Sequence, residues 1–99
     1  MAYFVVEFVF TADTERRLAI RPRHREYLAE LTGAGSLVLS GPWADDTGGL
    51  LVYRAEDRAA VERIMELDPY SADGAGVIAG ARITEWTPVS GFLLPHLQG

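Results

Sequence analysis

Cysteine is absent from this 99-residue chain. The absence excludes disulfides, thiol catalysis and zinc sites built from cysteine. A domain that needs no disulfide fits a reducing compartment, so we expect a cytoplasmic protein. Lysine is absent as well: all nine basic residues are arginine, and with 14 acidic residues the net charge is −5. Because nucleic-acid affinity rests largely on neutralising phosphates, we expect no nucleic-acid partner.

Long hydrophobic runs are also lacking. No apolar stretch approaches the roughly 20 residues that a membrane-spanning helix needs, so we expect no membrane association. The N-terminal segment has no basic region and is interrupted by Glu7 and Asp13, which is not the pattern of a signal peptide. Hydrophobic residues at 48% and charged residues at 23% are typical of a globular protein. We expect one domain over residues 1–99, with its core at about 2–89 and a C-terminal tail at 90–99.

Residues 3–10 are mostly β-branched or aromatic, which predicts a strand. Successive side chains of a strand point to opposite faces, so two sets of residues separate. One face receives Phe4, Val6, Phe8 and Phe10, and the other receives Tyr3, Val5, Glu7 and Val9. Both faces are largely apolar, so we expect both to be covered.

The first helix is predicted from Pro22 onward. Residues 11–20 are interpreted as a polar connection with room for a short helical turn, and proline suits the first turn of a helix. His24, Leu28 and Leu31 then recur at helical spacing. Glycines at positions 33 and 35 end this helix.

Turn signals divide the second half of the chain. Residues 36–40 and 50–53 are predicted as the strands of a hairpin, because Gly-Pro ends the first and a polar turn precedes the second. Residues 56–67 are predicted as a helix whose buried stripe is Val61, Ile64 and Met65. Asp68-Pro69 ends that helix, because the residue before proline avoids helical geometry.

The last strand is predicted within residues 77–89, with Ile83 and Trp86 as its anchors. The complete order, β-α-β-β-α-β, is that of the ferredoxin-like α+β fold. We therefore predict a four-stranded antiparallel sheet with two helices on one face. Nothing in the chain is left to cover the other face, which carries apolar side chains of the first strand. An exposed apolar surface usually marks an interface, so we predict a homodimer formed through the open sheet face.

Two residues are candidates for acid–base chemistry. His24 is predicted in the first turn of helix one, where a helix N-terminus disfavours the imidazolium and suits a neutral base. Its alternative interpretation is a half-buried histidine bonded to one backbone carbonyl. Asp68 is predicted on the buried side of helix two, and its alternative is an Asp-Pro helix stop that bonds its own turn. An aspartate that orients a histidine is a standard acid–base arrangement.

Five arginines lie within ten residues of this acidic chain, at positions 16, 17, 21, 23 and 25. One interpretation is a solvated face paired with Glu26 and Glu30. The other is an anion site near a helix start, with Arg21 and Arg23 as its members. No metal site is expected, because the only histidines are His24 and His96 and no paired ligand spacing is present.

Three short motifs carry a family resemblance: Arg21-Pro22-x-His24, Ser40-Gly41-Pro42 and Asp68-Pro69-Tyr70. In this order and spacing they resemble the YciI-like (YCII-related) family, over a span from Tyr3 to about Val89. The resemblance implies a ferredoxin-like subunit of the dimeric α+β barrel type, a dimer, and a His-Asp active site at His24 and Asp68. One branch of that family is implicated in removing chloride from a chlorinated hydroxyhydroquinone. The segment after Gly41-Pro42 is short here, where relatives can carry a longer loop.

Two functions are therefore predicted as alternatives. The first is an enzyme without a cofactor that acts on a small cyclic or enolisable anion. In it His24 moves the proton, Asp68 orients the imidazole, Arg21 or Arg23 holds the anion, and Ser40 hydrogen-bonds the substrate. The second is a non-catalytic module that binds a small ligand or a protein in the same cleft.

Overall fold

A central antiparallel sheet organises the chain. The structure is a computed structural model that describes residues 1–97. Its strands are ordered β2-β3-β1-β4, and every neighbouring pair is antiparallel. The elements in chain order are β1 (Ala2–Phe10), α1 (Thr14–Gly33), β2 (Leu37–Pro42), β3 (Gly48–Ala55), α2 (Arg58–Glu66), the short 3-10 helix η1 (Pro69–Ser71), β4 (Ile78–Trp86) and α3 (Leu94–Leu97). The predicted ferredoxin-like α+β fold is confirmed.

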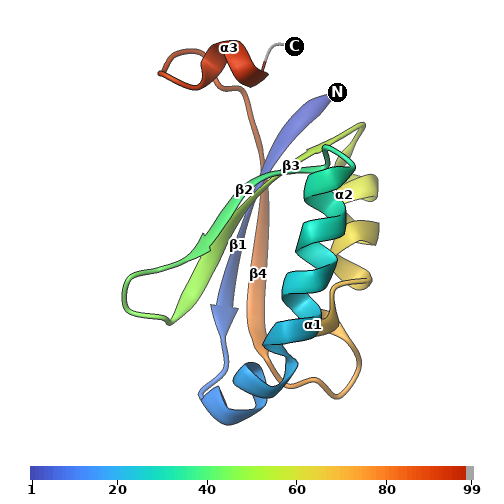
Figure 1. Cartoon of the computed structure of the whole chain (residues 1–99), viewed down its shortest axis with the longest axis vertical. Helices are drawn as coiled ribbons and strands as arrows, with labels where there is room; N and C mark the ends of the chain where they lie inside the picture. The colour runs from blue at the N-terminus through green and yellow to red at the C-terminus, as the bar shows by residue number, and fades with distance from the viewer. Residues whose placement is uncertain (98–99) are drawn as a thin grey trace.

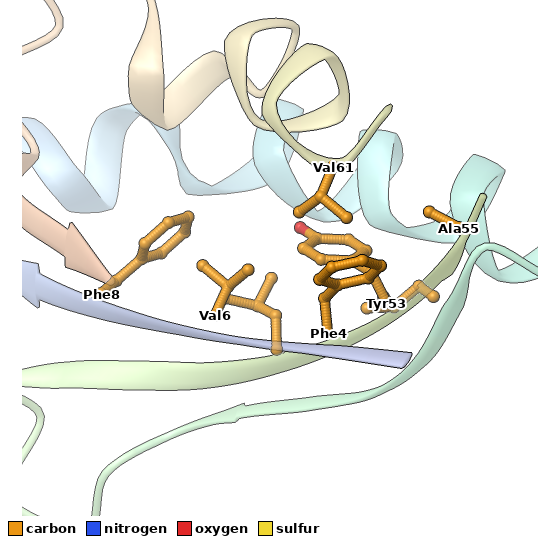
Figure 2. Packing of buried hydrophobic residues seen from close by; sticks show 8 residues of the cluster. Phe4, Val6, Phe8, Tyr53, Ala55 and Val61 are labelled. Carbon is orange, nitrogen blue, oxygen red and sulfur yellow. The ribbon is translucent and has the colours of Figure 1, made fainter. Parts of the chain in front are cut away.

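The core lies between the sheet and the two long helices, which cover the same face (Figure 1). The alternation predicted for β1 is confirmed, since Phe4, Val6 and Phe8 are buried there. Figure 2 shows Phe4 beside Tyr53 of β3 and beneath Val61 of α2, with Val6 and Phe8 farther along β1. Burying an aromatic or branched side chain stabilises a fold by about 1.5–3 kcal/mol. The β1 sequence therefore fixes both the core and the face on which a site can form.

The predicted start of the first helix is wrong. Helix α1 begins at Thr14, because the Asp13 side chain accepts a hydrogen bond from the Arg16 N–H at 3.1 Å and caps the helix. Pro22 lies inside the helix, which bends between its first turns and its longer remainder (Figure 1). His24 is therefore in the middle of α1, and the argument from a helix N-terminus does not apply to it.

The other predicted elements are present with shifted ends. The hairpin of β2 and β3 is confirmed, and its strands are longer than predicted because pairing runs on through Pro42 and Gly49. Glycine is required at position 48, where a Cβ would lie 2.0 Å from the Phe8 carbonyl oxygen. Of the two anchors predicted for β4, Ile83 packs against the core, whereas Trp86 pairs with Tyr3, is 44% exposed and faces the open side of the sheet.

No element of residues 1–97 crosses the open face of the sheet (Figure 1). Its exposed apolar side chains include Val9, Leu39 and Trp86, at 56%, 62% and 44% exposure. Helix α3 of the tail stands beyond the end of the sheet, where the Tyr3 hydroxyl donates to the Leu97 carbonyl. Within this described range no helix is long and apolar enough to span a membrane.

Candidate active site

A buried histidine and a buried aspartate meet beneath the helices. His24 projects from the middle of α1, and Asp68 lies in the turn that joins α2 to η1. Their side chains are hydrogen-bonded, with 2.7 Å between His24 Nδ1 and Asp68 Oδ1. Asp68 is fully buried and the His24 side chain is only 11% exposed. The structure therefore brings together the two residues that the sequence analysis selected from opposite halves of the chain.

Asp68 also caps the short helix that follows it. The Tyr70 backbone N–H donates to Asp68 Oδ1 at 2.9 Å, while Pro69 occupies the first position of η1. The same carboxylate thus serves its own turn and the imidazole 44 residues away. The two interpretations of Asp68 offered by the sequence describe one arrangement.

The histidine ring is held on a second side by an aromatic stack. The Tyr70 ring lies 3.8 Å from the His24 ring, centroid to centroid, and the two planes are 8° apart. Burial raises the pKa of the Tyr70 hydroxyl above its usual value, although the nearby charges of Arg17, Arg21 and Arg25 act in the opposite direction. The phenol is therefore protonated at neutral pH. Tyr70 belongs to the Asp68-Pro69-Tyr70 motif, but no spacing along the chain predicts a role for its ring.

This geometry selects one form of the imidazole. An aspartate carboxylate only accepts hydrogen bonds, so Nδ1 of His24 is the donor in the 2.7 Å contact. In a neutral ring the lone pair is then on Nε2. Because His24 lines a cleft between α1 and the sheet, Nε2 is the nitrogen left to exchange a proton with a bound molecule.

That cleft is a cavity of about 250 Å³ between α1 and the sheet. Its floor is apolar and includes Phe8, Phe10 and Leu51. Ser40 lies on its rim, because Ser40 pairs with Leu51 on the face of the sheet that the helices cover. Ser40 and His24 therefore line the same cleft, and a hydrogen bond from Ser40 to a substrate stays a prediction.

Three arginines line this cavity from the same helix. Arg17, Arg21 and Arg25 are spaced four residues apart, so they share one face of α1. Arg23 is exposed and does not line the cavity, so the structure does not support its prediction as an anion ligand. The four-residue spacing could have predicted that Arg17 and Arg25 share a face with Arg21. It does so only if the helix is known to begin before position 17.

Arg17 is the most enclosed of the three. It is 5% exposed, its guanidinium lies 4.7 Å from the Phe10 ring centre, and it donates to both carboxylate oxygens of Asp46 at 3.1 and 2.7 Å. Asp46 belongs to the β2–β3 turn and has a positive φ of 62°, which few non-glycine residues adopt. The Arg17 Nε atom is buried without a hydrogen-bond partner. The pair thus ties the hairpin turn to α1 at the cavity wall.

Residues 1–97 contain no group of three or more histidine, cysteine or acidic side chains gathered as metal ligands. His96, the second histidine of the chain, is exposed on α3 and lies outside the cavity. The chemistry available at this site is therefore that of an oriented imidazole, a neutral phenol and three guanidinium groups.

Comparison with known proteins identifies the family. The family model described as the YCII-related domain matches residues 1–87. The chain belongs to the YCII-related domain family. The resemblance inferred from the three short motifs is therefore confirmed, whereas the division into a core and a tail at position 90 stays a prediction. No curated protein matches the chain.

Solved structures share the fold of this YCII-related chain. The 5-chloro-2-hydroxyhydroquinone dehydrochlorinase from Burkholderia phenoliruptrix, in complex with 2,5-dihydroxybenzoquinone, is 24% identical with a TM-score of 0.72, and the match covers 86% of this chain and 93% of that one. An antibiotic biosynthesis monooxygenase is 12% identical with a TM-score of 0.61 over 91% and 100% of the two chains. The protein PA3566 from Pseudomonas aeruginosa is 12% identical with a TM-score of 0.59 over 89% and 93%. At these identities the likeness is one of fold.

Proposed function

We propose that this YCII-related protein is an acid–base enzyme that needs no cofactor and acts on a small cyclic or enolisable anion. The observation that carries the proposal is the 2.7 Å contact of His24 with the buried Asp68 at the wall of an arginine-lined cavity. A buried carboxylate beside an imidazole in a cleft is the arrangement that general acid–base catalysis uses.

The imidazole of His24 moves the proton. Its Nε2 accepts a proton from the bound anion and returns it to another atom, while Asp68 holds Nδ1–H and stabilises the imidazolium formed between the two steps. The Tyr70 stack at 3.8 Å keeps the ring in one plane. Such proton transfer by a positioned side chain is worth about 10²–10⁴ in rate.

The arginines hold the anion. Arg21 and Arg25 line the cavity, and neither forms a salt bridge in the described structure. Their guanidinium groups are therefore available to a carboxylate or an enolate, which they bind with charge-assisted hydrogen bonds. Ser40 at the rim supplies a neutral hydroxyl to the same ligand.

The volume of the cavity suits a small substrate. A cavity of about 150 Å³ holds benzene, so the 250 Å³ of this cavity suits one six-membered ring with its substituents. The apolar floor of the cavity favours a ligand with an apolar ring face. The complex of the similarly folded dehydrochlorinase with 2,5-dihydroxybenzoquinone supports a ligand of this size.

A thermal-shift screen against aromatic and lactone carboxylates tests binding, because a ligand that binds only the folded form raises its apparent stability. Arg21→Gln should raise the apparent Kd derived from the thermal shifts by roughly tenfold or more, because it removes a hydrogen bond to a charged group. Arg23→Gln is the matched control and should bind as the wild type does. Equal loss in both variants, or in neither, would contradict the proposed anion site.

Catalysis is tested on any compound that binds and is turned over. His24→Asn keeps an N–H near the position of Nδ1 but lacks a base, and Asp68→Asn removes the charge that supports the imidazolium. Both should lower kcat by roughly 10²–10⁴ while ligand binding persists. If both variants keep wild-type turnover, the mechanism is wrong, and if wild type binds ligands without turnover, the alternative of a binding module stands.

We also propose a homodimer formed through the open face of the sheet. Support comes from the exposure of Val9, Leu39 and Trp86 on that face. Light scattering at micromolar concentration should give the mass of a dimer, and Leu39→Lys should shift it toward the monomer. Leu67→Lys is the control, because Leu67 is 72% exposed at the end of α2 on the helical side. A wild-type monomer would overturn this part of the proposal.

A further inference from the structure

Besides Arg17 Nε, two buried side-chain atoms of the described residues have no hydrogen-bond partner. One is Oδ2 of Asp68, the carboxylate oxygen that does not face His24, and the other is the hydroxyl oxygen of Tyr53. Both residues are 0% exposed. An unpaired carboxylate oxygen and an unpaired hydroxyl are each costly in a protein interior, and together they form an acceptor and a donor.

The two groups that donate to Asp68 both serve the same oxygen. His24 Nδ1 and the Tyr70 backbone N–H both donate to Oδ1. Tyr27 has one hydroxyl proton, and it donates to the Ile64 carbonyl at 2.6 Å. Burial and the charge of Asp68 raise the pKa of Tyr27, Tyr53 and Tyr70, and of these three hydroxyls only that of Tyr53 is buried without a hydrogen-bond partner.

The position of Tyr53 suits this assignment. It lies on β3, between Phe4 of β1 and Leu37 of β2. Figure 2 shows its ring leaving the sheet with the hydroxyl directed toward the helical layer, near Val61 of α2. Burial, followed by the charge of Asp68, raises the pKa of Tyr53 above its usual value, so the hydroxyl keeps its proton.

We propose that Tyr53 is a positioning residue of the site, whose hydroxyl supplies the hydrogen bond to Asp68 Oδ2 through a single buried water. A water so placed meets two polar partners, which is what a buried water needs. The proposal deepens the proposed function, because the residue that Tyr53 positions is the partner of His24.

The consequence for the pair follows from geometry. With hydrogen bonds at Oδ1 only, a carboxylate can rotate about its Cβ–Cγ bond and carry its acceptor away from Nδ1. A donor at Oδ2 restrains that rotation and keeps the 2.7 Å contact aligned. Tyr53 thus reaches the imidazole through Asp68 and has no contact with the ligand itself.

The test is the Nδ1 proton of His24, observed by NMR in the full chain without any ligand. In Tyr53→Phe, exchange of this proton with water should accelerate by roughly tenfold or more, because the water that donates to the Asp68 carboxylate loses the hydroxyl that holds it in place. Tyr27→Phe is the matched control, since its hydroxyl serves a backbone carbonyl, and it should leave the exchange rate within about twofold of wild type. An unchanged rate in Tyr53→Phe, or equal acceleration in both variants, would overturn the proposal.

Unfolding in urea gives an independent check with a definite sign. If the Tyr53 hydroxyl has no partner, its removal leaves the urea midpoint of unfolding unchanged or higher. If the hydroxyl takes part in a hydrogen bond to the buried carboxylate, its removal lowers that midpoint. We expect a lower midpoint for Tyr53→Phe, and an equal or higher midpoint would refute the assignment. Neither measurement needs turnover, so failure here leaves the proposed acid–base function standing. Conversely, if the acid–base function proves wrong, both measurements on Tyr53 can still be made.

Discussion

Removing the imidazole of His24 should destabilise the fold far more than an ordinary histidine substitution does. The side chain donates to Asp68, which is 0% exposed, so His24→Ala leaves a buried carboxylate with one donor fewer. A hydrogen bond to a charged group contributes about 1.5–3 kcal/mol. The lost stack on Tyr70 adds about 0.5–1.5 kcal/mol. The expected loss in the free energy of unfolding is therefore about 2–4.5 kcal/mol.

This loss should depend on the charge at position 68. In the background of Asp68→Asn, the same His24→Ala change removes a neutral hydrogen bond of about 0.5–1.5 kcal/mol and leaves no buried charge behind. The cost should then fall to about 1–3 kcal/mol once the lost stack is included. The coupling between the two positions is thus of order 1 kcal/mol, which a double-mutant cycle resolves.

The assay is urea unfolding followed by circular dichroism on wild type, both single variants and the double variant. His96→Ala serves as the matched control, because His96 is exposed on α3 and should change stability by less than about 0.5 kcal/mol. In thermal unfolding, His24→Ala should lower Tm by at least roughly 8 °C, at 4 °C or more per kcal/mol. A His24→Ala variant as stable as His96→Ala, or an equal cost in both backgrounds, would refute the reasoning.

Three further predictions concern the surroundings of the site. Arg17→Ala removes a buried side chain together with its contact to Phe10, so it should lower stability by about 2 kcal/mol or more. Asp46→Asn should cost less, because the amide oxygen still accepts a hydrogen bond from the guanidinium; equal costs in urea unfolding would contradict this difference. The raised pKa of Tyr53 means that the fold favours its neutral phenol, so this contribution to stability is complete below about pH 10 and is lost as the pH rises above it. Above about pH 10 the free energy of unfolding should therefore fall less steeply with pH in Tyr53→Phe than in wild type. Parallel curves for the two proteins would show that Tyr53 is not the cause of the loss. Gly48→Ala should prevent folding or cost about 3 kcal/mol or more, because its Cβ would lie 2.0 Å from a backbone oxygen of β1. Gly41→Ala should be tolerated, because a Cβ at that position has nothing within 4 Å. Similar thermal midpoints for the two variants would exclude the clash at position 48.

The sequence carried much of the fold because its signals are local. Alternation over residues 3–10 separates Phe4 and Val6 from Val5 and Val9, and burial follows that separation. The turn at Asp68-Pro69 likewise ends α2 through a rule about the residue before proline. Element order and the buried face of the sheet could therefore be predicted without the structure.

The first helix was mispredicted because two local signals compete. Proline at position 22 suits a helix start, but Asp13 caps the backbone N–H of Arg16 and starts the helix two turns earlier. Tertiary contacts along α1 then offset the cost of a proline within the helix. Arg17 was assigned no place in the site for this reason.

Other parts of the site depend on contacts between distant segments. The Arg17–Asp46 pair requires the β2–β3 turn to reach α1, and the Tyr70 stack requires η1 to fold back on the same helix. No spacing along the chain encodes either contact. His24 and Asp68 could be selected because each is a polar residue on an otherwise apolar face, but their 2.7 Å contact came only from the structure.

The central claim is that His24 exchanges a proton with a molecule bound in the cavity. The most direct measurement is incorporation of deuterium from D₂O into carbon positions of small cyclic anions that raise Tm, followed by mass spectrometry with wild type, His24→Asn and Asp68→Asn. Wild type should incorporate deuterium, and both variants should do so roughly 10²–10⁴ times more slowly. Ligands that bind wild type and gain no deuterium, or that gain it equally fast with His24→Asn, would contradict the account.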